Sequence, residues 1–253
     1  MKFAAIVPTA YMSAVNNARH ANGSLHLILA HLCLESEEYV NRAIEAPGRK
    51  ILDNSFFELG YSLDTDTLLR IAEKVKADAI VLEDDTLKGY DKFYREGYDC
   101  YLTPHLAETL AKFAKLAAKD ACTYLCISHI AAKKIVGGKS FGVNNRAKVL
   151  KLLQNIVSAE EWEALKNGRL HFLGLGDNPQ IELAKIRRII GADFTCDSSM
   201  FLYPFIKSGG EKHFEDIALK SKAESIDFEF KSRGGTFDLR IGDEIRRLTN
   251  KLA

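Results

Sequence analysis

Eight short apolar runs recur along this chain, and longer amphipathic segments separate most of them. Runs of this length are typical of buried strands, and their alternation with helical segments favours an α/β fold with a parallel sheet. Eight such units favour a closed (β/α)8 TIM-type barrel, although an open doubly wound sheet gives a similar pattern. The predicted strands cover residues 3–8, 25–31, 50–56, 79–83, 100–103, 123–127, 170–175 and 194–196.

The segments between the runs carry apolar residues at helical spacing. In residues 64–76, for example, Leu68, Ile71, Ala72 and Val75 fall on one face of a helix. The same pattern predicts helices at residues 36–45, 64–76, 106–118, 145–157 and 178–190.

No linker or low-complexity segment divides the 253 residues, so we expect a single barrel domain over 1–253. Residues 1–203 carry the regular alternation and form the expected barrel core. Residues 204–253 have a looser pattern with glycine-rich loops, a candidate edge strand at 226–230 and a candidate helix at 242–253. We expect this strand and helix extension to cap the barrel.

The composition narrows the class of protein. The net charge of +1 gives no global field that would attract a polyanion. No run reaches the ~20 apolar residues that cross a bilayer, and no convincing cleavage region follows the first strand. The five cysteines favour buried, reduced thiols over a zinc site at Cys122 and Cys126. We therefore expect a cytoplasmic protein with no membrane partner and no metal.

Polar side chains follow five of the predicted strands where each strand ends. The carboxyl ends of parallel strands form the ligand site in such folds, so these side chains are expected to share one pocket. A carboxylate after a strand is often the N-cap of the next helix, which suits Asp85 and Asp177. Asp53 is a stronger functional candidate, because no helix is expected to begin at residues 54–57. Asp197, which is followed by Ser198, Ser199 and Met200, is the other strong candidate. A dinucleotide site is not expected, because Gly174 and Gly176 lack the third glycine of that motif.

Charge is segregated in one part of the chain. No acidic residue lies between Asp120 and Glu160, a stretch that holds several basic residues. Such a stretch is often a solvated helix face. Because it follows a predicted active-site strand, contact with a nucleic-acid backbone is the alternative hypothesis. The residues proposed for that contact are Lys133, Lys134, Lys139 and Arg146.

Four segments, in this order, resemble motifs of one enzyme family: residues 53–58 (DNSFFE), 83–86 (EDDT), 171–179 (HFLGLGDNP) and 193–199 (DFTCDSS). They are similar to those of the tRNA-guanine transglycosylase superfamily, and most closely of its small phage-type members that place 7-deazaguanine bases in DNA. The zinc-binding cysteine region of the tRNA enzymes is missing, so no zinc subdomain is expected.

The resemblance implies an enzyme that exchanges guanine in DNA, or alternatively in tRNA, for a free 7-deazaguanine base such as a preQ0-like base. It implies no cofactor, and a host-cytoplasmic location if the protein is phage-encoded. Asp197 takes the role of nucleophile, with Asp193 as the alternative. Asp53 helps to protonate the departing guanine and accepts a proton from the incoming base. A barrel that binds nucleic acid without catalysis is the alternative of another class. The implied base-contacting residues are Asn54, Glu83, Asp84, Ser128, His129, His171, Leu173 and Gly174.

Overall fold

The computed structural model describes residues 1–19, 25–138, 142–175, 179–198, 201–213 and 236–252. Eight strands lie at the centre, one in each predicted run. The apolar runs fix their positions because each strand is buried on both faces, between the barrel interior and the surrounding helices. The strands are β1 Lys2–Ala5, β2 Leu25–Leu29, β3 Arg49–Asp53, β4 Ala79–Val81, β5 Asp99–Leu102, β6 Thr123–Cys126, β7 Leu170–Phe172 and β8 Thr195–Ser198.

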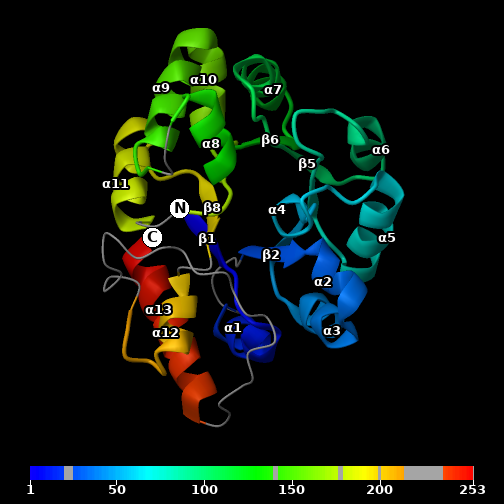
Figure 1. The fold of residues 1–253 in the computed structure, drawn as a ribbon, viewed down its shortest axis with the longest axis vertical. Coiled ribbons are helices and arrows are strands. Elements are labelled where there is room, and N and C mark those ends of the chain that lie inside the picture. Colours follow the sequence, from blue (N-terminus) through cyan, green and yellow to red (C-terminus); the bar gives the residue numbers. More distant parts are fainter. Residues whose placement is uncertain (20–24, 139–141, 176–178, 199–200, 214–235, 253) are drawn as a thin grey trace.

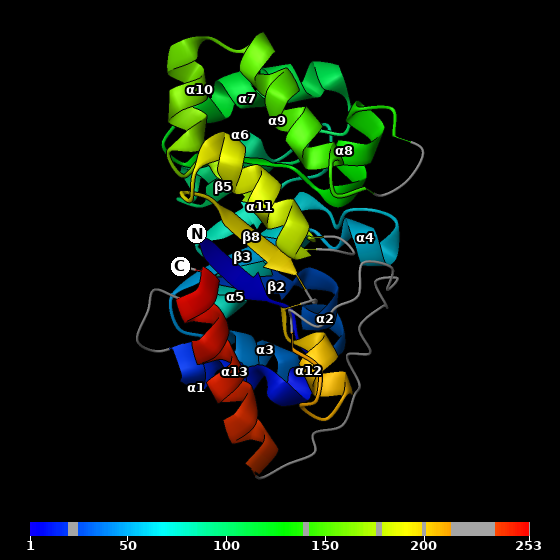
Figure 2. The same cartoon turned by 90° about the vertical axis from the view of Figure 1, so that its left-hand side faces the viewer.

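All the strand pairs are parallel, in the order β1-β8-β7-β6-β5-β4-β3-β2. The two ends of this order, β1 and β2, contact each other, so the sheet curls into a nearly closed ring. The helices surround the strands (Figure 1), and the neighbouring strands β1 and β8 point in the same direction (Figure 2). The prediction of a (β/α)8 barrel is confirmed.

The five predicted helices are present, and each end lies within one residue of its prediction. Several shorter helices were not predicted, because one or two turns show too few apolar repeats to reveal a period. The helices up to residue 190 are α1 Met12–Arg19, α2 Ala30–Glu35, α3 Glu37–Glu45, α4 Phe56–Leu59, α5 Thr65–Val75, α6 Tyr90–Arg95, α7 Ala107–Lys119, α8 His129–Ile135, α9 Asn145–Ile156, α10 Ala159–Lys166 and α11 Pro179–Ile190.

Two helices follow the last strand in the described residues, α12 (Tyr203–Lys207) and α13 (Thr236–Leu252). The helix predicted at 242–253 is therefore longer than expected, and it packs against α1 (Figure 2). The edge strand predicted at 226–230 lies outside the described residues. None of the helices in the described ranges combines the length and apolar character needed to cross a membrane.

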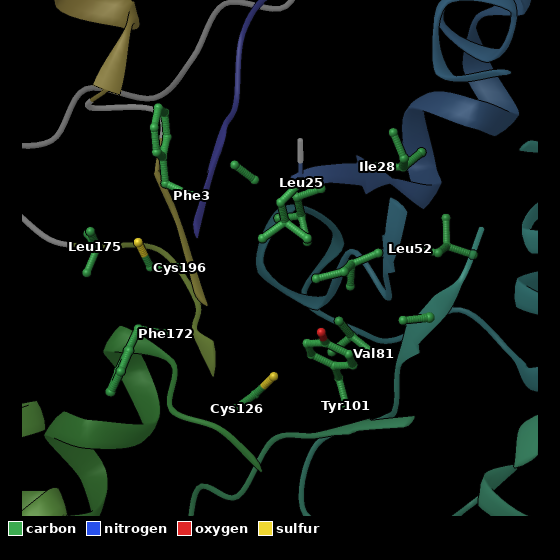
Figure 3. Packing of buried hydrophobic residues seen from close by; sticks show 14 of the residues in the cluster. Phe3, Leu25, Ile28, Leu52, Val81, Tyr101, Cys126, Phe172, Leu175 and Cys196 are labelled. Carbon is green, nitrogen blue, oxygen red and sulfur yellow. The ribbon is translucent and has the colours of Figure 1, made fainter. Parts of the chain in front are cut away.

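The core fills the barrel and the space between the strands and the helices. Figure 3 shows side chains from strands on several sides of the ring, among them Leu25, Val81, Tyr101 and Cys126, converging on one interior. Each of these four is at most 1% exposed. Full burial of a side chain such as Leu contributes about 1.5–3 kcal/mol. The interior is therefore a packed core, and chemistry is confined to its ends.

Candidate active site

The strand register turns the candidate carboxylates toward the interior of the barrel. Cys126 on β6 pairs with His171 on β7, and Asp197 lies two residues beyond the partner of His171 on β8. Such positions share one face of the sheet. Burial, and then the charges of Asp197, Asp53 and Asp84, raise the pKa of the Cys126 thiol. The three carboxyls therefore all lie near enough to this buried thiol to act on it electrostatically.

Asp197 is fixed by two hydrogen bonds and is 1% exposed. The backbone N–H of Gly174 donates to Oδ1 over 3.0 Å, and Nε2 of His171 lies 3.2 Å from Oδ2. Because a carboxylate can only accept, we assign the ring hydrogen of His171 to Nε2. Nδ1 then accepts from the hydroxyl of Thr195 at 2.7 Å. These contacts hold the carboxylate of Asp197 in one orientation.

His171 has no exposed surface, and its ring stands edge-on to Tyr101 with centroids 5.4 Å apart. These contacts fit a positioning role beneath Asp197 better than the expected stacking on a base. The backbone of Gly174, at φ 61°, is exposed next to the carboxylate, where it is in reach of a ligand. Leu173 is half-buried in the same turn.

Asp53 ends β3 in a different environment. Its Oδ2 accepts a hydrogen bond of 2.9 Å from the backbone N–H of Ser55. Burial raises the pKa of Asp53 to about 8, the charges of Glu58, Asp197 and Asp84 contribute to the rise, and the Ser55 N–H opposes it. A carboxyl with this pKa keeps its proton at neutral pH and can donate it to a ligand.

The turn after Asp53 corrects one expectation, because the one-turn helix α4 begins there at Phe56. Ser55 adopts a left-handed conformation with φ 59°, which reverses the chain. Its Oγ accepts a hydrogen bond from the backbone N–H of His31 over 3.0 Å. Oδ1 of Asn54 accepts from the N–H of Phe56 over 3.0 Å, and Nδ2 of Asn54 donates to the carbonyl of Leu82. Side chains rather than glycines therefore shape this turn.

Asp84 lies at the carboxyl end of β4 beside His105, a residue that the sequence analysis missed. Nε2 of His105 is 3.3 Å from Oδ2 of Asp84. Burial and the neighbouring Asp85 raise the pKa of Asp84 to about 7, while Lys134 and Asn54 lower it. His105 follows β5 as the other polar residues follow their strands, so the same rule could have found it.

The two acidic neighbours of Asp84 have other partners, although their charges raise its pKa. Glu83 is half-exposed and pairs with Lys88 over 3.3 Å. Oδ1 of Asp85 accepts hydrogen bonds from the backbone N–H groups of His105 and Leu106, where α7 begins. Asp85 is thus a capping residue, but of α7 rather than of the next helix in the chain. Asp177, the other expected cap, lies outside the described residues.

Ser128 caps α8: its Oγ accepts from the backbone N–H of Ala131 over 2.9 Å and lies 3.5 Å from Nε2 of His105. His129 is the first residue of α8 and is half-buried. Ser128 therefore touches the candidate site through His105.

The prediction that Arg146 contacts a nucleic-acid backbone is wrong, because its side chain is fully buried. Its guanidinium donates to the carbonyls of Ile127, Leu173 and Gly174, and it pairs with Glu182 over 2.8 Å. A buried charge requires such partners, because burial removes its hydration. Arg146 thus fixes the turn whose N–H group holds Asp197.

The three lysines of the proposed backbone contact have different surroundings. Lys134 is exposed on α8, and its Nζ lies 3.5 Å from Nδ1 of His105, next to the candidate site. Lys133 is half-buried on the same helix. Lys139 lies outside the described residues.

Asp193 is exposed and precedes β8, at the amino end of the strand. Asp197 lies inside the barrel toward the carboxyl end of the same strand. Only the second position brings a carboxylate to Asp53 and Asp84, so the structure favours Asp197 over its rival.

The cysteines are free; Cys122 is exposed, which the expectation of buried thiols did not include, and Cys33 is half-buried. In the part of the chain that the structure describes, no group of three or more His, Cys, Asp or Glu side chains is placed to hold a metal ion.

Comparison with known proteins adds little to this geometry. No protein-family model and no curated protein matches the chain. One similar solved structure is the carboxyl transferase domain from Rhizobium etli pyruvate carboxylase with pyruvate and biocytin, at a TM-score of 0.48 and 13% identity. The match covers 97% of this chain and 44% of that chain, so this chain spans less than half of that length. A similarity at this level carries no argument about function.

Proposed function

We propose that this protein is a guanine transglycosylase that exchanges guanine in DNA for a free 7-deazaguanine base through a covalent Asp197 intermediate. The observation that carries this proposal is the pair of buried carboxyls at Asp53 and Asp197. Hydrogen bonds from Gly174 and His171 orient one of them. Burial keeps a proton on the other, whose pKa is raised to about 8. Paired carboxyls in unlike environments are the requirement for nucleophilic and acid–base work at one sugar.

In the first step, an oxygen of Asp197 attacks C1′ of the nucleotide, and the bond from C1′ to N9 of guanine breaks. The bonding electron pair leaves with guanine, and the Asp53 carboxyl gives its proton to the departing ring. A glycosyl ester of Asp197 remains, with inverted configuration at C1′.

In the second step, Asp53, now a carboxylate, takes the proton from N9 of the incoming 7-deazaguanine. N9 attacks C1′ and releases Asp197, which restores the original configuration. Protons and bonds balance over the two steps, and the polymer backbone is never cut.

Recognition of the base falls to Asp84, whose carboxylate accepts hydrogen bonds from N–H groups of a guanine-type ring. The exchanged nucleotide must leave the helix stack to reach carboxyls this deep in the barrel, so a flipped or single-stranded nucleotide is the substrate. Lys133 contacts the polymer backbone outside the pocket.

The test is to incubate the protein with labelled guanine and either DNA or tRNA, and to count the label retained in polymer. Label in DNA, with a covalent adduct on a denaturing gel, is the expected result. Label in tRNA alone would move the activity to tRNA. If polymer binds but neither label nor adduct appears, the protein is a binding barrel and the proposal fails.

A further inference from the structure

Three side chains form a line of contacts from the surface of α8 to the carboxyl cluster. Nζ of Lys134 lies 3.5 Å from Nδ1 of His105, and Nε2 of His105 lies 3.3 Å from Oδ2 of Asp84. His105 is 5% exposed, whereas Lys134 is exposed at the outer end of the line. Neither His105 nor its contact with Lys134 is needed for the two chemical steps at Asp53 and Asp197.

The chemistry of the three groups fixes the direction of the hydrogen bonds. An ammonium group can only donate, so Nδ1 of His105 must accept from Lys134. A neutral imidazole that accepts at Nδ1 carries its hydrogen on Nε2, which faces Asp84. Burial and the charge of Lys134 lower the pKa of His105, which keeps the ring neutral. Asp84 is then the acceptor at the end of the line.

We infer that Lys134 and His105 are positioning residues that hold Asp84 ionised and oriented, and thereby select bases that present adjacent N–H donors. This inference rests on the proposed function and adds its specificity determinant. It also gives Lys134 a role in base recognition rather than in contact with phosphate.

The charges around Asp84 make Lys134 influential. Acidic groups face Asp84 from its own loop (Glu83 and Asp85) and from β3 (Asp53). The cation that opposes them is Lys134 on α8, and His105 faces Asp84 from the loop after β5.

The sign of the effect follows from this arrangement. Loss of a positive charge raises the pKa of every nearby group, because it favours binding of a proton. The pKa of Asp84 is already about 7, so a further rise leaves Asp84 mostly protonated at neutral pH. A protonated carboxyl no longer accepts from two N–H groups. Base binding should therefore weaken near pH 7 and recover as the pH rises.

The experiment compares Lys134→Met with Lys134→Arg, and uses Lys148→Met as the control for loss of an exposed lysine in the same basic stretch. KM for the free base, KM for the polymer and kcat are measured from pH 6 to pH 9. For Lys134→Met we expect KM for the base to rise about tenfold at pH 7, the size of a lost charge-assisted hydrogen bond. The difference should close toward pH 9, and Lys134→Arg and Lys148→Met should behave like the wild type.

A second measurement keeps this test separate from the proposed function. The NMR titration of His105 is recorded in the wild type and in Lys134→Met, with no substrate present. The pKa of His105 should rise in the variant; an unchanged titration overturns the inference whether or not the protein exchanges bases. Weaker polymer binding with a flatter salt dependence and an unchanged KM for the base would also overturn it, and would make Lys134 a phosphate contact.

Discussion

On the β7–β8 side of the barrel, Asp197 lies among buried groups that are held by hydrogen bonds and an ion pair: a backbone N–H group, the ring of His171 and the Arg146–Glu182 pair. On the β3–β5 side, Asp53 and Asp84 lie among other titrating groups. The pKa values of these two carboxyls are raised to about 8 and about 7.

The two sides also differ in how firmly their surface segments are held. On the β7–β8 side, Arg146 donates a hydrogen bond to the carbonyl of Gly174 and so fixes that turn. Helix α4, after Asp53, carries Phe57 and is followed by Tyr61, which are 77% and 59% exposed. In the proposed reaction, the first side holds Asp197 in place, and the second exchanges protons and contacts the ligand. Each prediction below tests this contrast.

The largest effect is expected for Asp197→Asn, which removes the proposed nucleophile. Covalent adduct and base exchange should both vanish, as measured by a denaturing gel and by label incorporation. The amide also presents an N–H₂ group to a fixed donor, so the variant should melt at a lower temperature than the wild type. Asp193→Asn is the matched control and should keep the adduct; loss of the adduct there instead would move the nucleophile.

The contrast predicts the opposite stability effect for Asp53→Asn. Exchange should slow by roughly 10²–10⁴, the usual contribution of a general acid. The raised pKa of Asp53 means that the folded state binds a proton that the unfolded chain releases, so stability falls as the pH rises from about 4 through 8. The neutral amide avoids this loss.

Urea unfolding should therefore find Asp53→Asn more stable than the wild type at pH 9, by at least about 1 kcal/mol. At pH 4 the two should be alike. A variant less stable than the wild type at pH 9 would remove the distinction between the two sides.

Arg146→Met tests the β7–β8 side of the barrel at a residue other than Asp197. The substitution leaves Glu182 buried without its cation and should lower the free energy of unfolding by about 3–5 kcal/mol in urea titration. The double variant with Glu182→Leu removes both charges and should regain much of that stability. If activity stays low in this restored variant, Arg146 also serves the alignment of Asp197 through Gly174; full activity would make it structural alone.

The smallest effect is expected for Phe57→Ala on α4. An aromatic ring that is 77% exposed contributes little to the core, so unfolding free energy should change by less than about 0.5 kcal/mol. Phe172→Ala on β7, fully buried, is the comparison and should cost about 3–5 kcal/mol in the same titration. Similar losses in both variants would show that α4 packs more firmly than its exposure indicates.

The residues that sequence could place are those whose role depends on a local pattern. Apolar residues in the runs 50–56 and 194–196 predict strands β3 and β8, and Asp53 and Asp197 lie toward the carboxyl ends of these strands. The pattern alone therefore predicts that the two residues lie near each other. Arg146 could not be interpreted this way. Its burial depends on carbonyls at Ile127 and Leu173 and on Glu182, which are far away along the chain.

Local backbone conformation was the other feature that the sequence could not predict. The sequence shows that Asp53 is followed by polar and aromatic residues, but not that Ser55 adopts a left-handed conformation and starts α4. His105 gave a usable signal that was overlooked. The difference between Lys133 and Lys134 depends on which face of α8 meets His105, and no pattern in the sequence reports it.

The hydrogen bonds of Asp85 connect the loop after β4 to the start of α7 in the outer ring of helices. The amide hydrogens of His105 and Leu106 both point at Oδ1 of Asp85, the residue next to Asp84. These hydrogens can exchange with solvent deuterium only when that contact opens. Their protection factors therefore measure how often the loop that carries Asp84 and Asp85 separates from the start of α7.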